Sequence, residues 1–143
     1  MARKAFYIGA MLGLVVISVF YANIIFHELG HFFVAKHYGL EPRLYLFDNG
    51  MGTGFSFTNQ NFYVTYNKVS ENKIIDGLIA LAGPLVNAIF ALAFGIAYCF
   101  APKKRKLVRL CLKMCFIISA LSAAVNFLPI NESDGEKILT TFF

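Results

Sequence analysis

The sequence predicts an all-α polytopic membrane protein, with three transmembrane helices and a membrane-associated β-hairpin between the first and second helices. Composition is the first reason, because 58% of the 143 residues are hydrophobic and only 15% are charged, whereas a soluble domain carries about 25% charged residues. The second reason is that three apolar stretches each exceed the roughly 20 helical residues that cross a bilayer. At this length we expect residues 1–143 to form a single domain.

The three apolar stretches place the helices at about residues 5–35, 74–101 and 107–130. The first stretch begins like a signal peptide, but it is longer than the 7–15 apolar residues of a signal peptide, so we expect a retained span. The basic run Lys103–Lys106 joins the second and third helices and is typical of residues that flank a membrane. We therefore expect no nucleic-acid partner, despite the net charge of +5.

The region at about residues 40–70 differs from these stretches in containing Pro42, several glycines and many aromatic residues. The segments 55–58 and 62–66 are rich in Phe, Tyr, Val and Thr and flank the polar residues 59–61. Such residue types favour two strands on either side of a short turn. We predict a β-hairpin here, at the membrane interface.

The segment His27-Glu28-Leu29-Gly30-His31 carries the most informative chemistry. Its two histidines are four residues apart, so on a helix both imidazoles project from one face and can share one metal ion. Glu28 would lie beside the metal and could take a proton from a metal-bound water, whose pKa falls to about 7. The alternatives are a chance match, polar packing and a structural metal site. Ionisable residues within an apolar span are costly and by default functional, and structural zinc sites are usually closed by four ligands rich in Cys.

Two histidines leave a metal site incomplete, so a third ligand is expected. Three crossings bring the end of the first helix, the start of the second and the end of the third to one side of the membrane, which we call side A. Asp134 follows the third helix just past Pro129 and is the favoured ligand, and Asn87 could converge at similar depth. The other candidate ligands are His37, Asp48, Glu71, Asp76 and Glu132.

Three motifs in this order resemble the signatures of the site-2 proteases, a family of intramembrane zinc metalloproteases: His27-Glu28-Leu29-Gly30-His31, Gly83-Pro84-x-x-Asn87, and Asn126-x-x-Pro129 followed by Asp134-Gly135. The resemblance implies one Zn²⁺ per chain, held by His27, His31 and Asp134. It implies that Glu28 is the general base and later the proton donor. Asn87 would bind the substrate backbone or stabilise the oxyanion, and Asn126 would shape the site near Asp134. It also implies that an unwound substrate segment adds as a strand to the hairpin.

These observations predict an intramembrane zinc metalloendopeptidase that cleaves transmembrane or membrane-associated polypeptides. We expect an integral, multi-pass protein of a bacterial or archaeal cell membrane, with the bilayer, its substrates and a regulatory membrane partner as its partners. The alternative is a non-catalytic membrane protein that binds a metal or a partner. That alternative is motivated by the small size of the chain and by Ser133, which stands where the family usually has Leu.

Two observations favour opposite orientations in the membrane. Seven Lys and Arg residues flank the side opposite to side A, which we call side B, and five flank side A. This difference favours side B in the cytoplasm. The family resemblance places the active-site side, side A, toward the cytoplasm, and we favour that orientation.

Overall fold

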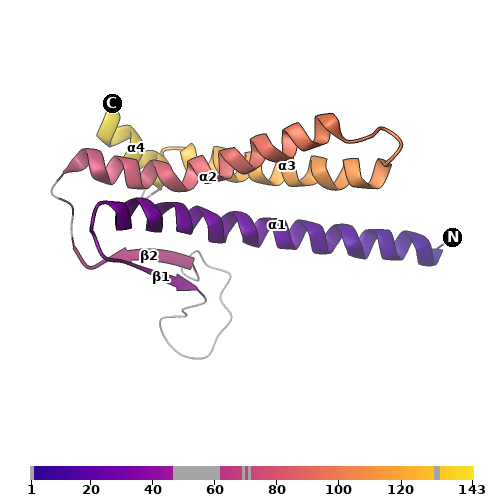
Figure 1. Cartoon of the computed structure of the whole chain (residues 1–143), viewed down its shortest axis with the longest axis horizontal. Coiled ribbons are helices and arrows are strands. Elements are labelled where there is room, and N and C mark those ends of the chain that lie inside the picture. The colour runs from indigo at the N-terminus through magenta and orange to yellow at the C-terminus, as the bar shows by residue number, and fades with distance from the viewer. Residues whose placement is uncertain (1, 47–61, 69, 71, 131–132) are drawn as a thin grey trace.

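The computed structural model describes residues 2–46, 62–68, 70, 72–130 and 133–143. In these ranges the chain forms four helices and two strands in the order α1 (Ala2–His37), β1 (Pro42–Leu46), β2 (Phe62–Tyr66), α2 (Lys73–Phe100), α3 (Lys106–Phe127) and α4 (Asp134–Phe142). Figure 1 shows α1, α2 and α3 lying side by side, with α4 and the hairpin at one end of the bundle and the N-terminus at the other.

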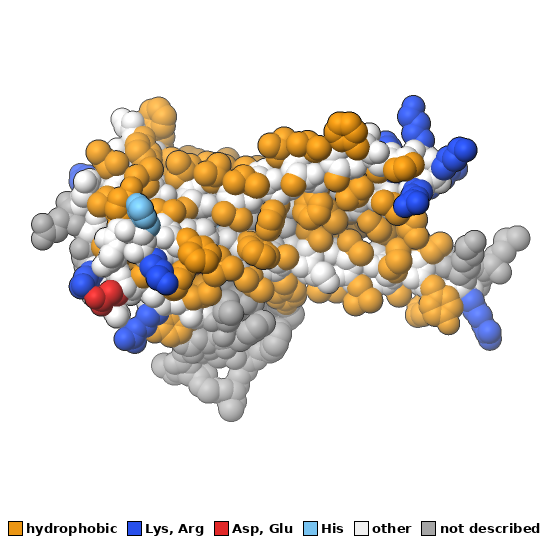
Figure 2. All heavy atoms as spheres, in the orientation of Figure 1, with side chains coloured by type: hydrophobic (Ala, Val, Ile, Leu, Met, Phe, Trp, Pro, Cys, Tyr) orange, Lys and Arg blue, Asp and Glu red, His pale blue; other side chains and the backbone are white. Residues whose placement is uncertain are grey.

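Within the described ranges, three helices are long and apolar enough to cross a membrane, as predicted: Phe6–His37, Lys73–Phe100 and Lys106–Phe127. Large apolar side chains such as Phe6, Leu92 and Leu121 are exposed on the outside of the bundle. Figure 2 shows an apolar middle on the face in view, with Lys and Arg side chains at the two ends. This surface suits a bilayer, where lipid tails cover the apolar middle and headgroups meet the charges. Helix α2 is the central element, because it packs against α1, α3 and α4.

Helix α1 ends in a Schellman motif that fixes the direction of the chain into the hairpin. Gly39 has a positive φ of 74°, and its N–H donates to the Lys36 carbonyl while the Leu40 N–H donates to the Ala35 carbonyl. These two bonds satisfy carbonyls that the helix end leaves free. Leu40 and Ala35 are buried together with Ile79 of α2, so the turn is anchored by an apolar contact.

The predicted β-hairpin is confirmed as an antiparallel pair of strands that packs against α1. Strand β2 has the predicted bounds, and its partner is β1, with Pro42 opposite Tyr66 and Leu44 opposite Val64. Backbone hydrogen bonds from Lys68 to the Leu40 carbonyl continue the pairing to the end of α1. The predicted strand at 55–58 and turn at 59–61 lie outside the described residues.

Helix α4 is an element that the sequence patterns did not predict, and Ser133 caps its N-terminus. The Ser133 hydroxyl accepts the Glu136 N–H at 3.1 Å and donates to the Leu128 carbonyl at 2.9 Å. Next to the cap, a Cβ on Gly135 would meet the carbonyl oxygen of Leu128. The turn from α3 into α4 is therefore tight, and it needs a small residue at 135 and a capping residue at 133.

Candidate metal centre

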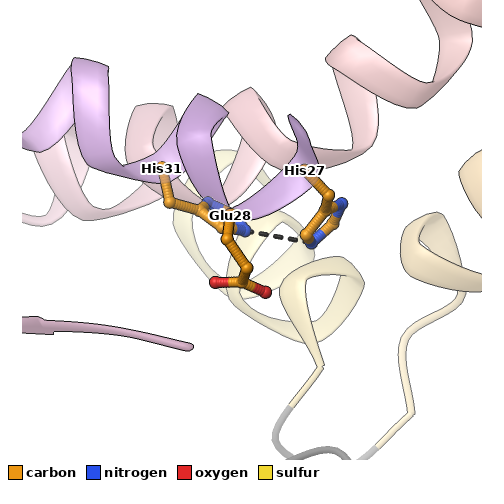
Figure 3. A group of neighbouring side chains, drawn as sticks. All are labelled: His27, Glu28 and His31. Atoms are coloured by element: carbon orange, nitrogen blue, oxygen red, sulfur yellow. Dashed lines mark hydrogen bonds between the residues drawn. The ribbon is translucent and has the colours of Figure 1, made fainter. Parts of the chain in front are cut away.

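The two imidazoles of α1 face each other across one helical turn, as their spacing predicts. Their Nε2 atoms are 3.1 Å apart, and both residues are only 7% exposed. Figure 3 shows the two rings and the Glu28 carboxylate gathered beneath the same stretch of α1. The Nδ1 atom of His31 is 2.6 Å from the Ile79 carbonyl oxygen of α2. Since a carbonyl only accepts, His31 Nδ1 carries a proton and Nε2 keeps its lone pair for a metal.

Asp134 completes a triangle of ligand atoms with the two histidines. Its Oδ2 atom lies 3.0 Å from His27 Nε2 and 3.2 Å from His31 Nε2. A zinc ion about 2.0–2.1 Å from each of four tetrahedral ligands sets those ligands roughly 3.3 Å apart. The three atoms thus have the chemistry and the spacing for one zinc ion, and three protein ligands leave the fourth position of a tetrahedron free.

The electrostatics around Asp134 favour the ionised form that a metal requires. Burial opposes ionisation, but the neighbouring His27 and His31 rings outweigh it and hold the pKa of the Asp134 carboxyl well below its usual range. The carboxylate is therefore an anion at any physiological pH.

Glu28 lies beside this triangle. The ligand atoms of His27, Glu28 and His31 all lie within 4.8 Å of one another, so Glu28 is itself a possible third ligand by distance. Asp134 is the better one, because its oxygen approaches both ring nitrogens to 3.2 Å or less. Glu28 is half-buried at the edge of the triangle, where a proton acceptor for a water molecule is needed.

Glycines let α2 pass directly against the face of α1 that carries His27 and His31. A Cβ on Gly83 would lie 2.7 Å from His27 Nε2 and would also meet His31 Nε2. A Cβ on Gly30 would lie 2.8 Å from the Ala82 carbonyl oxygen. Both glycines belong to motifs that were found in the sequence. The contact between α1 and α2 that requires a glycine at each position is visible only in the fold.

The two predicted asparagines both converge on His27. The Nδ2 atoms of Asn87 on α2 and Asn126 on α3 lie 3.2 Å and 3.4 Å from His27 Nδ1, the ring nitrogen that does not face Asp134. Asn87 is 1% exposed, and its Oδ1 has no hydrogen-bond partner among the described residues. Asn23, one turn before His27 and equally buried, donates to Ser119 of α3 at 3.0 Å. It was not predicted, because a lone Asn in an apolar span carries no motif.

Of the other candidate ligands, the two that lie within the described residues are not part of the triangle. His37 packs edge-on against the Tyr38 ring at the end of α1, and Asp76 lies in the first turn of α2. Asp48, Glu71 and Glu132 lie outside the described residues.

Comparisons with known proteins identify the family of this chain. Residues 15–109 match the model of peptidase family M50. The chain is 34% identical over 129 residues to "Putative zinc metalloprotease MJ0611" of Methanocaldococcus jannaschii, covering 82% of this chain and 65% of that protein. It is 28% identical over 138 residues to "Putative peptide zinc metalloprotease protein YydH" of Bacillus subtilis, covering 94% of this chain and 50% of that protein. The chain thus spans between half and two thirds of the length of these relatives, and no solved structure matches it.

The matched range contains the part of the first span that carries its two histidines, and the whole second span with Gly83 and Asn87. Asn126 and Asp134 lie beyond that range, so their part in the site rests on the distances above. The match covers most of the chain, and the chain therefore belongs to peptidase family M50, the site-2 protease family.

Proposed function

We propose that this chain is a zinc metalloendopeptidase that cleaves peptide bonds of transmembrane or membrane-associated polypeptides. The observation that carries the proposal is the triangle of His27 Nε2, His31 Nε2 and Asp134 Oδ2, with Glu28 beside it, near the end of a membrane-spanning helix. The names of both relatives support zinc as the metal.

Each residue of the site has a distinct task in this reaction. His27, His31 and Asp134 would hold the zinc ion, which would supply the Lewis acidity that polarises a peptide carbonyl and makes water acidic enough to lose a proton near neutral pH. Glu28 would accept the proton of the attacking water and later deliver it to the nitrogen of the departing chain. Because Glu28 is not needed as a ligand, it stays free for both transfers.

The hairpin offers a way to present a substrate to this site. A helical substrate shields its peptide bonds in its own hydrogen bonds, so it must unwind before cleavage. The two-stranded sheet of β1 and β2 packs against α1, and the outer edge of a sheet can pair with an added extended strand. We propose that an unwound substrate segment binds in this way. The sources of the matched relatives support a bacterial or archaeal membrane.

Ser133 was one reason to consider a non-catalytic protein, and the fold gives a structural explanation for a serine at this position. Ser133 caps α4 and supports the turn that carries Asp134 into the site. The departure from Leu is thus compatible with an intact zinc site.

Cleavage of a model transmembrane peptide by the purified, zinc-loaded chain in detergent tests the proposal. Glu28→Gln should bind zinc like the wild type and cleave about 100- to 10,000-fold more slowly, the range for general acid–base catalysis. Glu41→Gln is the matched control, since Glu41 pairs with Lys68 in an exposed ion pair away from the metal ligands. Equal cleavage by Glu28→Gln and wild type would refute the mechanism, and a zinc-loaded wild type that cleaves no membrane peptide would refute the function.

A further inference from the structure

We propose that Asn87 is a positioning residue, which holds the His27 ring so that Nε2 is available to zinc, and that it does not contact the substrate. This inference rests on the proposed zinc site and assigns Asn87 a different role from the substrate or oxyanion contact that the family resemblance implied.

A histidine that binds zinc through Nε2 must carry its proton on Nδ1, and that proton needs an acceptor. For His31 the acceptor is the Ile79 carbonyl oxygen, 2.6 Å away. The backbone of α2 therefore fixes one of the two rings. His27 needs an equivalent acceptor, because its Nε2 faces both His31 and Asp134.

Asn87 is the group in position to supply that acceptor. Its amide lies 3.2 Å from His27 Nδ1, closer than the amide of Asn126 at 3.4 Å. With Nδ2 toward the ring, Asn87 leaves its Oδ1 buried without a partner among the described residues, and an NH₂ group cannot accept a proton from Nδ1. A half-turn of the amide places Oδ1 against the ring. His27 Nδ1–H then donates to Asn87, as His31 Nδ1–H donates to Ile79.

Burial separates this role from a contact with substrate. Asn87 is 1% exposed, whereas Asn126 is half-buried. Asn87 lies on the Nδ1 side of His27, while Asp134 and the second imidazole lie at Nε2. A peptide at the zinc position would meet the Nε2 side and would not touch a side chain buried behind the ring.

The test measures zinc affinity of the full chain in detergent by competition with a chelating dye. Asn87→Leu removes the acceptor at similar volume and should weaken zinc binding about 10- to 100-fold, the range for the loss of a hydrogen-bond partner of a ligating histidine. Asn87→Asp keeps an oxygen at the same place and should restore affinity to near that of the wild type. Asn23→Leu is the matched control, since Asn23 is also 1% exposed but bonds to Ser119 and Val19 and not to His27.

The outcomes separate this inference from the proposed function. A loss of affinity in Asn87→Leu beyond that in Asn23→Leu, together with rescue by Asn87→Asp, supports the positioning role even if no peptidase activity is found. Equal zinc affinity of Asn87→Leu and Asn23→Leu overturns it. So does failure of Asn87→Asp, eluting as a folded monodisperse protein, to bind zinc better than Asn87→Leu. A wild type that binds no zinc overturns both the inference and the proposed function.

Discussion

A single methyl group at position 83 should weaken zinc binding at least about 100-fold. Gly83 of α2 faces the two imidazoles of α1 that we propose as zinc ligands, and a Cβ there would lie 2.7 Å from both Cε1 and Nε2 of His27 while also meeting His31 Nε2. The methyl group of Gly83→Ala would thus stand where the ligand atoms converge, at the place a metal ion needs.

The size of the effect follows from two opposing terms. Replacing Gly by Ala inside a helix stabilises the helix by about 0.5–1 kcal/mol. Against that gain, ordinary van der Waals contact begins at 3.4 Å, so His27 must retreat by roughly 0.7 Å, while metal–ligand distances tolerate only about ±0.2 Å. Since changes to residues behind the ligands already cost about 10- to 100-fold in affinity, we expect zinc affinity to fall at least about 100-fold.

Competition with a chelating dye measures this loss, and Gly95→Ala is the control. Gly95 lies on the same helix, and a Cβ there would approach only the Phe116 ring, at 3.3 Å and 3.5 Å. Gly95→Ala should therefore bind zinc like the wild type. A Gly83→Ala protein with wild-type zinc affinity would show that α2 does not lie against the metal ligands, and would refute the site geometry.

Two further predictions concern α4 and the hairpin. Ser133→Leu should destabilise α4 by about 1 kcal/mol through loss of its cap, and so lower zinc affinity by up to about fivefold. Ser133→Asp should keep both the cap and the zinc affinity. Equal zinc affinities of Ser133→Leu and the wild type would contradict this prediction. Burial, with Glu28 and Asp134 nearby, raises the pKa of Tyr66 to about 12, so the stability contributed by its neutral phenol is complete below pH 10 and lost as pH rises through 12. In the zinc-free protein, the ultraviolet difference titration between wild type and Tyr66→Phe should show this transition, and a midpoint near 10 would contradict it.

The helices could be predicted because their signal is local. Apolar runs longer than a bilayer is thick predicted three spans, and the observed ends of α1, α2 and α3 lie within about three residues of those expected. Strand β2 was also predicted, from its content of aromatic and β-branched residues. Its partner at Pro42–Leu46 was not, because pairing depends on the turn after Gly39 that directs the chain back along α1.

The sequence predicted which side chains converge on the candidate site, but not the contacts that support them. The four-residue spacing of His27 and His31 is a property of one helix, and Asp134 followed from counting membrane crossings. Helix α4 was not predicted, because it is nine residues long and mixes polar with apolar residues. Its capping residue Ser133 is the feature of the sequence that indicates this helix. The partners of the ring nitrogens, Ile79 and Asn87, come from another helix and emerge only when the helices are packed.

X-ray absorption at the zinc edge of the purified, zinc-loaded chain tests whether His27, His31 and Asp134 hold the metal. We expect one zinc ion with two imidazole nitrogens and carboxylate or water oxygen at about 2.0–2.1 Å, with one imidazole lost in His31→Ala and one oxygen in Asp134→Ala. A thiolate sulfur at about 2.3 Å would place zinc on a cysteine instead. That result, or a spectrum unchanged by both substitutions, would refute this ligand set.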